Sequence, residues 1–208
     1  AKVLLYSGRY RESQIESARC SLNEAKYVLG LAQFNTWSWP YAEESFSSYL
    51  NSSAKKDEKS VSYAQFYLGY AQYRQGKSKK AYAALSDFVK KYPGHELFWN
   101  AQMAAANAAV QNNEPEKAAL HAESAVQNAS GDAETEEAVL LCAEIYTDSK
   151  KYKKALDLLA PYTKRSAEFG MKSIYKTGQI YEKQLDLSSA DAAYKSLAQK
   201  FPGEKLAE

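Results

Sequence analysis

Side chains that could do chemistry are few in this sequence and stand far apart. The chain has two histidines, His95 directly after a Pro-Gly pair and His121 inside an expected helix, and two cysteines, Cys20 and Cys142. A metal site needs such residues in closely spaced clusters, and the sequence has no such cluster. It also has no glycine-rich phosphate loop and no G-x-S-x-G motif. The sequence therefore predicts no catalytic residue, no metal site and no cofactor, so we expect this chain not to be an enzyme.

The charge pattern argues against a nucleic-acid partner. The net charge is only +2, and no set of Lys or Arg recurs at a fixed period, as a helical-repeat RNA reader would need. Residues 61–95 carry six Lys or Arg and one Asp, whereas residues 96–150 carry two Lys and ten Asp or Glu. This charge either solvates the surface or steers a charged partner. No apolar run is long enough for a transmembrane segment.

Pairs of small residues twelve positions apart recur along the chain. The stretch from Ser62 to His95 reads as two amphipathic helices joined at Gly76, with Gly69 on the first and Ala81 on the second. Small side chains at such positions let two helix backbones approach closely. The same spacing separates Gly30 and Ala42, Ala106 and Ala118, Ala143 and Ala155, and Gly178 and Ala190. The pattern predicts a stack of helical hairpins.

These residues and the near-identical tails KKYPG and QKFPG give the chain a resemblance to the tetratricopeptide repeat family, whose unit is a helix–turn–helix of about 34 residues. The resemblance implies an all-α, right-handed α-solenoid of about eleven helices. We expect one solenoid over residues 1–208, as a fragment of a longer chain, with a further helix beginning at 204–208. Its units are a partial one at 1–22 and full ones at about 23–56, 62–95, 99–132, 136–169 and 171–204.

The resemblance also implies a non-catalytic scaffold that binds a partner peptide or helix on the concave face formed by the first helices. The family's clamp for a C-terminal carboxylate uses Lys and Asn, but the matching positions hold Tyr27, Leu31, Phe66 and Tyr70. A chaperone-tail clamp is therefore not expected. The tails resemble those of bacterial envelope repeat proteins, which favours the periplasm or cell envelope and leaves the cytoplasm open.

Aromatic side chains gather on the expected concave face of the first two full units. Such residues suit an anchor pocket, although they could instead pack against neighbouring helices of the stack. The acidic segment around Glu137 would then help to choose the partner. The candidate partner-binding residues are Tyr27, Phe34, Tyr63, Phe66, Tyr70, Tyr73, Arg74, Met103, Asn107, Glu137 and Glu144.

Four local features give further expectations. Trp37 and Trp39 replace the usual glycine-containing turn, and we expect them to form a packed corner rather than a ligand site. Ser78 should cap the second helix of its unit, and Pro161 should end another second helix early. Cys20 and Cys142 should both be buried and free, because they belong to different units.

Two other function classes stay open. The segment could be structural, associating with further repeats or another copy through its open ends, or it could be the repeat arm of an enzyme whose catalytic domain lies elsewhere. Sedimentation at rising concentration separates self-assembly from the scaffold.

Overall fold

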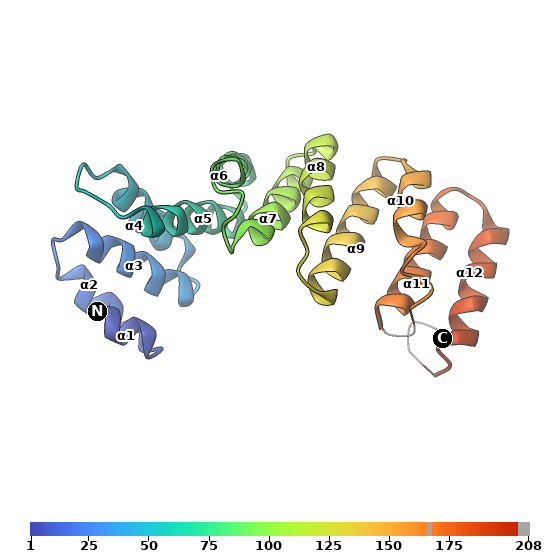
Figure 1. Cartoon of the computed structure of the whole chain (residues 1–208), viewed down its shortest axis with the longest axis horizontal. Coiled ribbons are helices and arrows are strands. Elements are labelled where there is room, and N and C mark those ends of the chain that lie inside the picture. The colour runs from blue at the N-terminus through green and yellow to red at the C-terminus, as the bar shows by residue number, and fades with distance from the viewer. Residues whose placement is uncertain (166–167, 204–208) are drawn as a thin grey trace. The chain divides into compact units, whose positions relative to one another are not determined.

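The computed structural model describes residues 1–165 and 168–203, and all regular elements in this part of the chain are α-helices (Figure 1). It has one helix more than the sequence predicted, because the short α1 precedes the expected N-terminal helix. The helix expected at 204–208 lies outside the described residues. The helices are α1 (Lys2–Tyr6), α2 (Tyr10–Ala18), α3 (Asn23–Asn35), α4 (Trp39–Asn51), α5 (Glu58–Arg74), α6 (Ser78–Lys91), α7 (Phe98–Gln111), α8 (Pro115–Gln127), α9 (Asp132–Asp148), α10 (Tyr152–Leu159), α11 (Glu168–Lys183) and α12 (Leu187–Lys200).

The helices form two compact units, residues 1–114 and residues 115–208. In the first unit each helix from α2 to α6 packs on the next one, and α3 also contacts α5, as α5 contacts α7. The first helices of successive hairpins therefore form one continuous layer. In the second unit α8 to α12 pack in the same consecutive order, and α9 contacts α11. The all-helical repeat architecture predicted from the sequence is confirmed.

The small-residue pairs lie where the helices of a hairpin touch. Gly30 on α3 faces the Phe46 ring on α4 so closely that an added Cβ would lie 2.7 Å from a ring carbon. A Cβ on Gly69 would lie 2.9 Å from Cγ of Leu85 on α6. Such distances are shorter than carbon atoms normally approach, so only glycine fits without movement of the neighbouring helix. Their partners Ala42 and Ala81 are fully buried.

Helix ends follow the sequence signals only in part. Asp57 and Asp186 cap α5 and α12, each accepting a hydrogen bond from a backbone N–H three residues later. Helix α10 ends at Leu159, two residues before Pro161, as predicted. The prediction for Ser78 was wrong: it is the first residue of α6, and its hydroxyl donates to Oε1 of Gln111 instead, with the Gly76 carbonyl oxygen 3.3 Å away.

Both cysteines are free, but only one is buried. Cys142 lies in the interior of the second unit, where burial raises the pKa of its thiol to about 11. The prediction that Cys20 is buried was wrong, because α2 ends at Ala18 and leaves Cys20 exposed in the connection to α3. Within the described residues, no helix is both long and apolar enough to span a membrane.

Candidate functional site

An open groove of about 330 Å³ crosses the layer of first helices in residues 1–114. It lies between the end of α3, the α3–α4 turn, the middle of α5 and the start of α7. Six of its ten lining side chains are aromatic. The lining residues are Phe34, Asn35, Trp37, Trp39, Phe66, Tyr67, Tyr70, Arg74, Leu97 and Asn100. We call this site the aromatic groove.

Phe34 is the centre of the aromatic contacts in the groove. Its ring centroid lies 5.0 Å from that of Trp39 in an edge-on arrangement and 4.6 Å from that of Tyr67. Tyr70 approaches it at 5.7 Å. These distances fall within the range in which edge-to-face aromatic pairs attract each other, so helices α3, α4 and α5 together hold the walls in place.

Arg74 is the one charged side chain among the groove's lining residues. Tyr67, Tyr70 and Arg74 are spaced three and four residues apart, which places them on one face of α5. The Arg74 guanidinium lies over the Trp39 ring, 4.8 Å from its centroid, in a cation–π contact. The groove therefore combines apolar walls with a positive charge at one end.

Four of the residues predicted from the sequence meet in this groove: Phe34, Phe66, Tyr70 and Arg74. Phe66 was expected on the exposed face and is instead only 4% exposed, packed in a core cluster with Phe88 and the alanines of α7. It forms the floor of the groove, while the half-buried Tyr70 forms a wall.

The structure adds Trp37, Trp39 and Tyr67 to the predicted residues. The unusual pair of tryptophans in a hairpin turn was the sequence signal that could have found the first two. The packed corner expected there is right for Trp39, which contacts Phe34, and wrong for Trp37, which is 77% exposed. No separate signal in the sequence pointed to Tyr67.

Other predicted residues lie outside the groove. Tyr27 packs on Phe46 and Tyr49 between α3 and α4, where burial raises the pKa of its hydroxyl. Tyr73 packs against Tyr70 and the core of α5 to α7. Met103 was expected to be exposed and is only 5% exposed. Asn107 donates a hydrogen bond to the Met103 carbonyl one turn earlier on α7.

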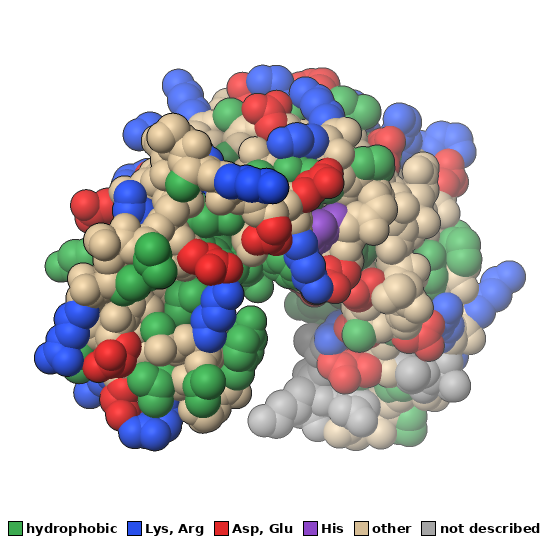
Figure 2. Space-filling view, turned by 60° about the vertical axis from the view of Figure 1, so that its left-hand side comes forward, with side chains coloured by type: hydrophobic (Ala, Val, Ile, Leu, Met, Phe, Trp, Pro, Cys, Tyr) green, Lys and Arg blue, Asp and Glu red, His purple; other side chains and the backbone are tan. Residues whose placement is uncertain are grey.

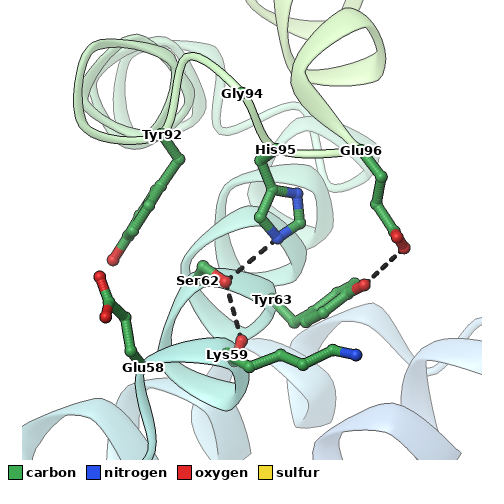
Figure 3. Close-up of a pocket in the computed structure, with 8 residues that line it drawn as sticks. All are labelled: Glu58, Lys59, Ser62, Tyr63, Tyr92, Gly94, His95 and Glu96. Atoms are coloured by element: carbon green, nitrogen blue, oxygen red, sulfur yellow. Dashed lines mark hydrogen bonds between the residues drawn. The ribbon is translucent and has the colours of Figure 1, made fainter.

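Tyr63 belongs to a second pocket, of about 640 Å³, between the start of α5 and the α6–α7 connection (Figure 3). Its hydroxyl donates to the Glu96 carboxylate, which raises the pKa of Tyr63 to about 12. The same pocket contains His95, whose Nε2 lies 3.1 Å from the Ser62 hydroxyl oxygen. A Ser–His pair at this distance is the arrangement that nucleophilic catalysis requires, so its hydrogen bonds decide its role.

Those hydrogen bonds indicate a structural pair. The backbone N–H of Leu97 donates to Nδ1 of His95, so the ring proton lies on Nε2 and is donated to Ser62. The Ser62 hydroxyl in turn donates to the Lys59 carbonyl at 2.8 Å. His95 therefore cannot accept the Ser62 proton in this tautomer. The pair fastens the α6–α7 connection to α5, as the dashed lines in Figure 3 show.

Half of the six acidic side chains of α9 pair with lysines of α11. Glu136 pairs with Lys172 at 2.7 Å, and Asp148 pairs with Lys183 at 2.8 Å. The predicted partner-binding residue Glu144 pairs with Lys176 at 3.3 Å, and the other one, Glu137, is exposed. Over the face in view in Figure 2, which brings the left-hand side of Figure 1 forward, acidic and basic side chains lie interspersed. The structure therefore gives α9 less free negative charge than the sequence alone suggested.

A family model for the tetratricopeptide repeat-like domain matches residues 28–207. The chain belongs to this family. The match covers most of the chain. This repeat fold generally mediates protein–protein interaction. A comparison with curated proteins returned no match to the sequence.

Solved structures of other repeat proteins are similar to this chain in fold. The apo form of RapI superimposes with a TM-score of 0.72 at 15% identity over 96% of this chain, which spans only 60% of RapI. YrrB, a TPR protein with an unusual peptide-binding site, gives 0.67 at 15% identity over 95% of each chain. BtubC from P. vanneervenii gives 0.65 at 16% identity over 96% of this chain and 90% of that one. At these identities the likeness concerns the fold alone.

Proposed function

We propose that this repeat protein is a non-catalytic interaction scaffold and that the aromatic groove is its binding site. The occupant is an extended segment of a partner protein that places an apolar side chain against Tyr67 and Tyr70 and a carboxylate at Arg74. The observation that carries the proposal is the combination of half-exposed aromatic walls with one positive charge, that of Arg74, which forms no salt bridge within residues 1–165 and 168–203. Binding surfaces favour aromatic residues because they bury a large area, and they favour arginine because it pairs with carboxylates.

The chemistry of the walls limits what the groove can bind. Four half-buried rings offer apolar faces, and their burial favours a ligand that places an apolar group against them. Asn35 and Asn100, which are exposed at the rim, offer amide groups to the backbone of an extended peptide. The peptide-binding site of YrrB, a protein of similar fold, is consistent with a peptide as the class of ligand here.

The test begins with a random peptide library displayed on phage and panned against the full chain. We expect the enriched peptides to share an apolar residue close to an aspartate or glutamate. The dissociation constant of the best peptide, with a fluorescent label, is then measured by anisotropy for the protein and its variants. Failure to enrich any peptide family would contradict the proposal.

Two variants measure separately how much the aromatic wall and the charge of Arg74 contribute to binding. Tyr70→Ala should weaken binding by about 2 kcal/mol, roughly thirtyfold, as truncation of an aromatic anchor typically does. Arg74→Gln should remove the preference for the acidic residue over its amide counterpart while leaving the apolar preference. Tyr41→Ala is the matched control, since Tyr41 is a tyrosine exposed on α4 outside the groove. Wild-type affinity in both Tyr70→Ala and Arg74→Gln would refute the assignment of the site.

A further inference from the structure

Every hairpin turn in the described residues passes through one residue with a left-handed backbone. In the α3–α4 turn this residue is Trp37: its own N–H bonds to the Phe34 carbonyl, and the N–H of Ser38 bonds back to the Gln33 carbonyl at 2.9 Å. This pair of bonds is the Schellman arrangement, which requires a positive φ at the residue after the helix. The six residues, with their φ values, are Gly8 (78°), Trp37 (59°), Gly76 (72°), Asn113 (57°), Lys150 (57°) and Leu185 (63°).

Trp37, Lys150 and Leu185 are the bulky residues in this set, and of these three Trp37 and Leu185 are apolar. A bulky side chain in the left-handed region meets the following carbonyl oxygen, whereas glycine adopts the region without strain. Packing could offset such strain, but Trp37 is 77% exposed and Leu185 is 85% exposed. At these two turns the fold therefore keeps a large apolar side chain that both strains the backbone and contacts water.

The two residues differ in what they border. Trp37 lines the aromatic groove, beside Phe34 and Trp39, whereas Leu185 is not among the groove's lining residues. Backbone strain in a bulky residue is often retained where the side chain serves a site. An exposed tryptophan at a groove rim is also the residue type that contributes most to hot spots.

We infer that Trp37 is a specificity-determining residue of the groove: its indole covers the apolar side chain of the bound segment and makes the groove select large or ring-shaped side chains over small ones. This inference rests on the proposed function. The walls formed by Tyr67 and Tyr70 contact one side of the occupant, and the indole in the turn encloses it from the rim. A small side chain cannot reach the indole, so it loses this contact.

The test compares Trp37→Gly with Leu185→Gly in the full chain. Both changes put glycine at a left-handed turn position, so both should raise the melting temperature. Two labelled peptides are used as probes, the best peptide from the library and the same peptide with alanine at its apolar anchor. Leu185→Gly should bind both as the unchanged protein does. Trp37→Gly should bind the anchored peptide about tenfold more weakly and lose most of its discrimination against the alanine peptide.

The outcomes distinguish this inference from the proposed function. If Tyr70→Ala weakens binding and Trp37→Gly does not, the groove stands and the role of Trp37 is refuted. If neither variant changes affinity, the peptide binds elsewhere and both proposals fail. If Trp37→Gly weakens both peptides equally, Trp37 has no part in selection. A lower melting temperature in Trp37→Gly would show that the indole stabilises the fold, and would likewise overturn the inference.

Discussion

Replacing Gly30 by alanine tests the helix contact that sets the repeat. The new Cβ would lie 2.7 Å from the Phe46 ring, which is fully buried in a cluster with Ala42 and Tyr49 and can move only if those neighbours move too. Alanine favours the helical state by about 1 kcal/mol over glycine. Overpacking a filled core costs about 1–3 kcal/mol. We therefore expect Gly30→Ala to lower the free energy of unfolding by about 0–2 kcal/mol, despite the gain in helix propensity.

Gly178→Ala gives the contrasting case. Its Cβ would approach the Tyr194 ring even more closely, at 2.4 Å, but that ring is only half-buried, so a shift towards solvent costs it less than it costs the buried Phe46 ring. Helix propensity should then prevail, so we expect little loss of stability or a small gain. Gly94→Ala controls for the added methyl group alone, because Gly94 lies in the α6–α7 connection, outside any helix, and nothing lies within 4 Å of the position where its Cβ would be.

Urea denaturation followed by circular dichroism measures the change in the full chain. Hydrogen exchange of the α3 and α4 amides localises it, because a repeat protein need not unfold in one step. A rise of about 1 kcal/mol in Gly30→Ala, the full helix-propensity gain, would refute the argument from close approach.

Two further predictions concern pH and local stability. Burial lowers the pKa of His95, with Glu96 opposing the shift and Lys59 adding to it, so folding keeps the ring neutral. The unfolded chain then binds more protons below pH about 6.5, and stability should fall as the pH drops through that value. His95→Gln should flatten this dependence in urea titrations, and an unchanged slope would contradict it. Helix α8 buries only alanines, so its amides should exchange faster than those of α6, which buries Leu85 and Phe88; slower exchange in α8 would be evidence against this.

The sequence predicted the hairpins well, because their register depends on residue size. Gly30, Ala42, Gly69 and Ala81 all lie at buried helix contacts, as their twelve-residue spacing indicated. Burial on the first helices was harder to predict. Phe66 and Tyr70 are one helical turn apart on α5, and periodicity gave both the same face.

Phe66 is more buried than Tyr70 because of the small side chains on α7 that face it. Alanines of α7, including Ala101 and Ala105, leave room into which the Phe66 ring extends. Tyr70 has no such space and stays half-exposed. The left-handed position of Trp37 could not be predicted from its own type either, since the backbone hydrogen bonds of the turn impose it.

Many polar contacts in the described residues join two side chains that lie about one repeat apart in the sequence. Ser62 and His95 are 33 positions apart, Glu43 and Lys77 are 34 apart, and Asp148 and Lys183 are 35 apart. A charged residue with an opposite charge one repeat away is therefore neutralised within the stack, as Lys172 and Lys183 neutralise acids of α9.

Arg74 departs from that rule in a way that bears on function. One repeat before it in the chain stands Trp39, so its guanidinium rests on an aromatic ring rather than a carboxylate. The ring orients the guanidinium but does not neutralise it, and Arg74 has no carboxylate partner in the part of the chain that the structure describes. Other charges pair with a residue one repeat away, but the Arg74 guanidinium stays available to a carboxylate of a partner. It lies beside the groove walls formed by Phe34 and Tyr70. For this reason Arg74→Gln, more than any change in the acidic segment of α9, should alter which partners the protein accepts.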